Sequence, residues 1–177
     1  QWHLNQLPSR PLSRQSSVTI IGAGIAGCTT AAALSKRGYN VTIIDRHATA
    51  GQEASGNQQA IIYPKLSIRD EPLPRINLAA ITLASRYYQT FWNRGLGQQC
   101  GVLVIPEGKR QRKQFEQLGQ HFYHQKSLVR LVDNAQMEAI AGISLDTSHG
   151  LYFSKLGWLP PATICQEILK DHNIALI

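Results

Sequence analysis

Long hydrophobic runs are missing from this sequence of 177 residues. A membrane-spanning helix needs about 18 consecutive apolar residues. The longest apolar run, Val18–Gly27, is shorter than that and contains three glycines. The first residues, Gln1–Arg14, are polar and include prolines, so they do not resemble a secretory signal. The sequence therefore predicts no membrane partner.

Cysteine is also scarce. The three cysteines, Cys28, Cys100 and Cys165, are odd in number and show neither a Cys-x-x-Cys pair nor a zinc-ligand spacing. We expect three small buried side chains in a protein of the reducing cytoplasm. His121 and His124 lie three residues apart in an expected helix, but no third ligand has a suitable spacing. No metal site is predicted.

The chain is basic, and few of its residues are charged. Hydrophobic residues make up 43% and charged residues 16%, which suits a packed globule. The formal net charge of +7 favours polyanionic partners, nucleic acid first. The cations of Lys109–Lys113 gather at one expected helix start, with Lys126 and Arg130 further on. Phosphate contact and an ordinary solvated face remain equally open interpretations of this cluster.

The two ends of the sequence carry two expectations. Residues 1–16 are rich in proline, serine and arginine without periodicity, which is typical of a linker. There is no initiator Met, and Asn173–Ile177 looks like a strand without a following turn. We expect the chain to be a piece of a longer polypeptide, truncated at its C-terminus.

Hydrophobic periodicity predicts the main elements. Short β-branched runs at Val18–Ile21 and Val41–Ile44 predict two buried strands, with a helix over Ile25–Arg37 between them. Apolar residues at helical spacing predict an amphipathic helix whose buried face consists of Ile76, Ala80, Leu83, Tyr87 and Phe91. Further strands are expected at 59–63, 102–105, 128–132 and 151–153, and further helices at 109–125 and 134–139. A closing helix over 161–170 and a strand over 173–177 are expected to return to the first sheet.

A glycine-rich turn follows the first strand and opens the first helix. In Gly22-Ala23-Gly24-Ile25-Ala26-Gly27 the first glycine permits the tight turn, the second lets a pyrophosphate approach, and the third allows close helix–strand packing. The N–H groups and dipole of the helix start attract phosphate. Asp45 lies 18 residues after Gly27, at the end of the second strand. There its carboxylate can accept hydrogen bonds from ribose hydroxyls. The whole arrangement predicts a dinucleotide site.

The turn alone does not distinguish NAD from FAD. Asp45 argues against NADP, because its carboxylate would repel a 2′-phosphate. Arg46 beside it weakens that argument slightly, although a solvated surface arginine is the simpler interpretation of this residue.

The next stretch carries a family resemblance. Ala54-Ser55-Gly56-Asn57, followed by Gln58, Gln59 and Tyr63-Pro64, resembles the amino-acid-oxidase class of flavoproteins. Within that class it is similar to the FAD-dependent oxidoreductase domain of the bifunctional tRNA 5-methylaminomethyl-2-thiouridine biosynthesis proteins. Leu66-Ser67, Asp70-Glu71, Cys100-Gly101-Val102 and Gly157-Trp158 through Ala162 match the same family, so the likeness extends over about 17–177.

The resemblance implies a fold, a cofactor and a reaction. The fold is an α/β, Rossmann-like FAD-binding domain (17–99 and 156–177) with an inserted, smaller mixed α+β region (100–155). The reaction is oxidation of the carboxymethylaminomethyl group on the wobble uridine of tRNA to aminomethyl. The resemblance also implies a methyltransferase domain in the same polypeptide. No residue of this chain is nominated as a catalytic acid or base. The implied FAD-binding residues are Gly22, Ala23, Gly24, Ile25, Ala26, Gly27, Asp45, Arg46, Ala54, Ser55, Gly56, Asn57, Gln58, Gln59 and Ala60.

Two other functions stay open. The first is a small-molecule amine oxidase of the glycine-oxidase or sarcosine-oxidase kind, with the same fold and flavin. The second is a nucleotide-binding fragment without catalysis. The resemblance implies that residues beyond Ile177 complete the flavin site, so the isolated chain is expected to bind FAD poorly.

Overall fold

The computed structural model describes residues 16–172 and 174–177, which form two compact units. One unit contains the described residues up to Asn57 together with Pro161–Ile177, and the other contains Gln58–Pro160. Residues 58–99 therefore group with 100–155 and not with 17–57, unlike the expected boundaries at 99/100 and 155/156. The assignment of 17–99 to the FAD-binding domain stays a prediction. The expected linker over 1–16 lies outside the described residues, except for Ser16.

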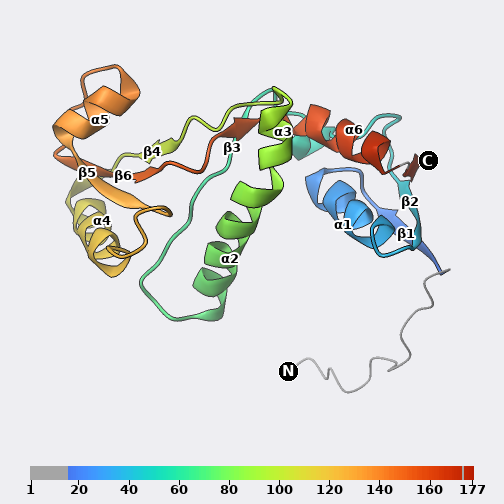
Figure 1. The fold of residues 1–177 in the computed structure, drawn as a ribbon, viewed down its shortest axis with the longest axis horizontal. Coiled ribbons are helices and arrows are strands. Elements are labelled where there is room, and N and C mark those ends of the chain that lie inside the picture. Colours follow the sequence, from blue (N-terminus) through green and yellow to red (C-terminus); the bar gives the residue numbers. More distant parts are fainter. Residues whose placement is uncertain (1–15, 173) are drawn as a thin grey trace. The chain divides into compact units, whose positions relative to one another are not determined.

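The first unit is a small parallel α/β layer (Figure 1). Its strands run in the order β1-β2-β8, all parallel. The predicted return of a helix and strand to the first sheet is confirmed, because β8 pairs with β2. The elements are β1 (Ser17–Ile21), α1 (Ile25–Ser35), β2 (Asn40–Ile44), the 3₁₀ turn η2 (Glu53–Ser55), α6 (Pro161–Asp171) and β8 (Ala175–Leu176).

The register of this sheet brings the glycine turn beside the end of β2. Ser17 lies opposite Asn40 and Ile21 opposite Ile44. Just past the strands, the N–H of Gly22 donates to the carbonyl of Ile44 at 2.8 Å. The carboxyl ends of parallel strands share one sheet edge, which is where α/β proteins bind ligands.

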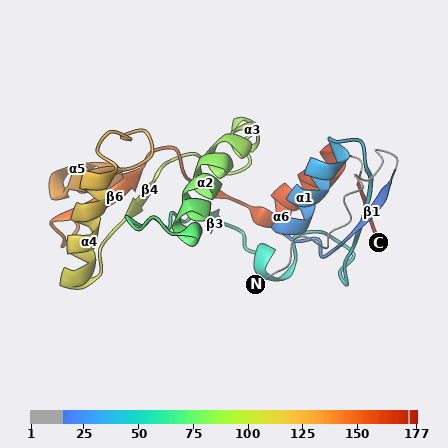
Figure 2. The ribbon, with the colours of Figure 1, turned by 90° about the horizontal axis from the view of Figure 1, so that it is seen from below.

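Helices α1 and α6 lie side by side and bury small and branched side chains between them (Figure 2). Cys28 and Cys165 are fully buried there, and the thiol of Cys28 donates a hydrogen bond to the carbonyl of Ala23 at 3.4 Å. Cys100 is exposed, so the prediction of three buried cysteines was wrong for that residue. It lies in a segment in which Gln98 is exposed as well.

The second unit combines helices with two antiparallel sheets, in agreement with a mixed α+β region. Strands β4, β6 and β5 form a three-stranded sheet in the order β4-β6-β5, and β3 pairs with β7. Asp133 begins α5 with a capping box to Gln136, which satisfies N–H groups at the helix start. The elements are β3 (Ala60–Ile61), α2 (Pro72–Tyr87), α3 (Gln89–Asn93), β4 (Val102–Val104), α4 (Gly108–His121), β5 (Arg130–Asp133), α5 (Asn134–Ala141), β6 (His149–Phe153) and β7 (Trp158–Leu159).

The predicted buried face of the long amphipathic helix was wrong for Ile76, Ala80 and Leu83, which are exposed, and is confirmed for Phe91, which is buried. The helix divides at Tyr88 into α2 and α3, and Ile76 and Leu83 are 64% and 68% exposed. Ile81 packs instead into the core with Phe115 and Phe153, and Leu78 lies against the same cluster. Two apolar stripes occur on α2 at helical spacing, and periodicity cannot tell which of them faces the core.

Candidate dinucleotide site

The glycine turn has the backbone geometry that its residues allow. Gly22 leaves β1 with φ +100°, a conformation that residues with a side chain rarely adopt. A Cβ on Gly27 would lie 1.9 Å from the carbonyl oxygen of Gly22, so only glycine permits α1 to approach the strand this closely. The turn therefore holds the start of α1 tightly against the end of β1.

The start of α1 is open to an anion. Gly24 is the N-cap residue and supplies no side-chain hydrogen bond. The first N–H groups of a helix lack partners within it and, with the helix dipole, favour negative charge. One of them, the N–H of Ile25, donates to Oγ of Ser55 at 3.2 Å. Ser55 thus places a hydroxyl from the resemblance stretch at the helix start.

Asp45 ties the glycine turn to the end of β2. Its Oδ2 accepts a hydrogen bond from the N–H of Ala23 at 2.6 Å, and its Oδ1 accepts one from the N–H of His47 at 2.9 Å. These backbone hydrogen bonds, first that from Ala23, hold the pKa of Asp45 below its ordinary value. Each carboxylate oxygen keeps a lone pair that can accept a hydrogen bond from a ribose hydroxyl.

A cluster of charged residues lies beside this carboxylate. Arg46 is exposed and pairs with Glu53 at 3.2 Å, and Nε2 of His47 lies 2.9 Å from the same carboxylate oxygen. The hydrogen bond from His47, followed by the charge of Arg46, lowers the pKa of Glu53. Glu53 has φ +57°, the left-handed region that is unusual for a residue other than glycine. Glu53 and His47 were not predicted from the sequence, because no local motif marks an acid that pairs across a loop.

The predicted site residues divide between the two compact units. The unit of the glycine turn also holds Asp45, Arg46 and Ala54–Asn57, and Nδ2 of Asn57 donates to the carbonyl of Ala54 at 3.2 Å. Gln58, Gln59 and Ala60 belong to the second unit, where Ala60 begins β3. The residues around the turn thus share one unit and these last three belong to the other. The FAD-binding role of every member stays a prediction.

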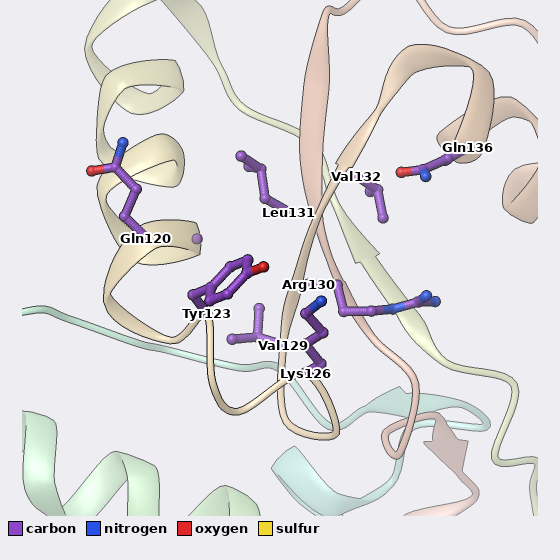
Figure 3. A pocket seen from close by; sticks show the side chains of 9 residues that line it. Gln120, Tyr123, Lys126, Val129, Arg130, Leu131, Val132 and Gln136 are labelled. Carbon is purple, nitrogen blue, oxygen red and sulfur yellow. The ribbon is translucent and has the colours of Figure 1, made fainter.

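The second unit has hollows of its own. One of about 430 Å³ lies between the end of α4 and β5 (Figure 3). Nζ of Lys126 lies 4.7 Å from the ring centre of Tyr123, and Arg130 lies over Tyr152 at 5.3 Å. Leu131 and Val132 line the space between Gln120 and Gln136 (Figure 3). These cations are therefore stacked on aromatic rings.

Two further observations concern metals and membranes. Among residues 16–172 and 174–177 there is no group of three or more His, Cys, Asp or Glu side chains arranged to hold a metal ion. None of the helices in the described part of the chain combines the length and the apolar character that a membrane span requires.

The parallel layer, the glycine turn at its strand ends and the acid that closes β2 define an α/β dinucleotide-binding protein. The comparison with protein families is more specific, since residues 17–172 match the family described as FAD dependent oxidoreductase. The chain belongs to that family.

Curated relatives agree with this assignment. The chain is 35% identical over 164 residues to the tRNA 5-methylaminomethyl-2-thiouridine biosynthesis bifunctional protein of Stutzerimonas stutzeri, covering 93% of this chain and 24% of the relative. The protein of the same name from Pseudomonas putida is 36% identical over 158 residues, covering 89% and 24%. The chain thus spans about a quarter of the length of these relatives.

Two solved structures with a similar fold are oxidases by name. Fructosyl peptide oxidase from E. terrenum superposes with a TM-score of 0.69 at 18% identity, covering 94% of this chain and 41% of that one. Glycine oxidase from Geobacillus kaustophilus superposes with a TM-score of 0.68 at 15% identity, covering 90% and 45%. At these identities the likeness concerns the fold.

Proposed function

We propose that this chain binds the ADP part of FAD at the glycine turn. The observation that carries the proposal is the turn itself, with Gly22 at φ +100° and with Asp45 fixed to Ala23 across 22 positions of sequence. The start of α1, where Gly24 makes no side-chain cap, directs N–H groups to the pyrophosphate, and the carboxylate of Asp45 lies where a ribose would follow. The residues present therefore fit the cofactor.

The reaction that we propose is oxidation of a secondary amine on tRNA. The carboxymethylaminomethyl group of the wobble uridine is oxidised at the carbon next to nitrogen, and water then releases that carbon as glyoxylate, leaving aminomethyluridine. Bound FAD would accept the two electrons and one proton as hydride. The contribution of this chain is to hold the nucleotide, and no side chain in it is assigned as acid or base. The names of the relatives support the choice of substrate.

The proposal includes partners and a location. The word bifunctional in the names of both relatives supports a methyltransferase domain in the same polypeptide, acting on the aminomethyl product. The net charge of +7 suits a polyanionic substrate such as tRNA. A tRNA-modifying enzyme of this kind would work in the cytoplasm.

The experiment uses the full-length polypeptide that contains this sequence. Its absorbance spectrum should show bound flavin, and tRNA carrying the carboxymethylaminomethyl group should yield aminomethyluridine and glyoxylate. A flavoprotein that oxidises free glycine or sarcosine and leaves that tRNA unchanged would instead be a small-molecule amine oxidase. A purified protein without flavin absorbance, and with no gain on adding FAD, would refute the proposal.

A further inference from the structure

A second hollow in the unit of residues 58–160 is strongly basic. It has a volume of about 750 Å³ and lies between the segment 65–77 and the N-terminal half of α4. Five cationic side chains and one acid line it. We call it the basic groove, and its charged members are Lys65, Arg69, Glu71, Lys109, Arg110 and Lys113.

Most of these cations have no acidic partner. Arg69 lies 3.8 Å from Glu71, at the limit of an ion pair. No other lysine or arginine of the groove takes part in an ion pair within the part of the chain that the structure describes. All five cations are solvent-exposed, so their charge is available to a ligand.

Helix α4 places its cations where they oppose its own dipole. Lys109 and Arg110 lie in its first turn and Lys113 in the next, and the first turn contains no acidic residue. The positive end of the dipole repels cations, so this arrangement is unfavourable for the helix by itself. A bound polyanion would remove the repulsion.

We propose that the basic groove binds the phosphodiester backbone of RNA, an inference that rests on the proposed tRNA substrate and locates one of its contacts. The lining contains no aromatic side chain on which a base could stack, so the contact is with phosphates and is independent of sequence. The cations near the hollow in Figure 3 differ, because Lys126 and Arg130 each lie over a tyrosine ring.

The test compares two double charge reversals with the same change in net charge. Lys109→Glu with Lys113→Glu alters the groove, and Lys126→Glu with Arg130→Glu is the matched control in the same unit. The probe is a fluorescently labelled, unmodified tRNA transcript, titrated at several salt concentrations with the full-length polypeptide that contains this sequence. The groove variant should lose about tenfold or more in affinity and reduce the slope of log K against log salt by about 2. The control should lose clearly less.

Equal losses in the two variants would overturn the proposal, because net charge alone would then explain binding. Failure of the wild-type protein to bind the transcript would overturn it as well. So would a groove variant that binds the transcript as tightly as wild type. Misfolding is not expected, since glutamates at positions 109 and 113 favour the helix dipole, and the melting temperature should stay equal or rise.

The groove and the proposed function can fail separately. Flavin absorbance and oxidation of tRNA report on the function, whereas the salt-dependent difference between the two variants reports on the groove. A full-length protein without flavin whose groove variant still loses RNA affinity would leave the groove standing. A flavoprotein that oxidises tRNA and binds it equally well in both variants would refute the groove alone.

Discussion

Ala23 and Asp45 are joined by a hydrogen bond of 2.6 Å from the backbone N–H of one to Oδ2 of the other. A second bond, from the N–H of His47, fixes the other carboxylate oxygen at 2.9 Å. The acid that closes β2 therefore also shapes the glycine turn, before any nucleotide is considered. Asp45 thus stabilises the turn and, under the proposed function, also binds the ribose. Substitutions can distinguish these two roles.

Asp45→Asn should make the chain less stable at neutral pH, because an amide accepts hydrogen bonds from N–H groups more weakly than a carboxylate does. The folded-state pKa of Asp45 lies below its unfolded value near 3.8. Its contribution is therefore complete above that value and is lost as the pH falls through the folded pKa. Melting temperatures of wild type and variant should differ at about pH 7 and converge in strong acid. A constant difference at every pH would contradict this account.

Two glycines of the turn should respond differently to alanine. Gly27→Ala puts a Cβ 1.9 Å from the carbonyl oxygen of Gly22 and should cost about 1–3 kcal/mol in the free energy of unfolding. Gly24→Ala meets only the hydroxyl of Ser55 at 3.3 Å, so the stability should change little. Under the proposed function it should still weaken flavin binding, because the methyl group faces the approach of the pyrophosphate. Urea unfolding of the full-length protein measures the stability, and flavin titration measures the affinity. A Gly24→Ala variant as unstable as Gly27→Ala would show that the turn has no room for a methyl group at position 24.

The two faces of α2 provide a matched pair of substitutions. Ile81→Ala removes a side chain that is 5% exposed and should cost about 2–5 kcal/mol. Leu83→Ala changes a residue that is 68% exposed and should cost at most about 0.5 kcal/mol. Chemical denaturation of the isolated chain tests both. Equal costs would mean that the stripe of Ile76 and Leu83 is covered after all.

Thiol reagents should distinguish the three cysteines. Cys100 is exposed and should react first. Cys28 and Cys165 are both 0% exposed, and the neighbouring thiol of Cys28, together with burial, raises the pKa of Cys165. Mass spectrometry after brief labelling near pH 8 should find one modified cysteine in the native chain and three after denaturation. Labelling of Cys165 as fast as Cys100 would contradict the buried pair.

The sequence predicted best where the chemistry is local. Gly22 and Gly27 could be interpreted from their spacing, since a tight turn and a close helix–strand approach admit few other residues. Asp45 followed from its place at the end of a strand. Each of these inferences needed only neighbours within one βαβ unit.

Prediction failed where long-range packing decides. Leu83 and Ile81 stand on different faces of one helix, and only the tertiary fold selects the face that is buried. Cys28 and Cys165 are remote in sequence and meet because α1 and α6 pack together. Glu53 gained its partners, Arg46 and His47, through a loop conformation that propensities do not encode.

The order of the strands in the parallel sheet has a consequence for synthesis on the ribosome. Strand β2 lies between β1 and β8, and β8 is made after the whole of residues 58–160. The second unit is continuous in sequence, so its contacts can form as soon as it emerges, while β2 still waits for one neighbour. A pulse-labelled nascent chain should therefore acquire protease resistance in 58–160 before the nucleotide-binding layer does.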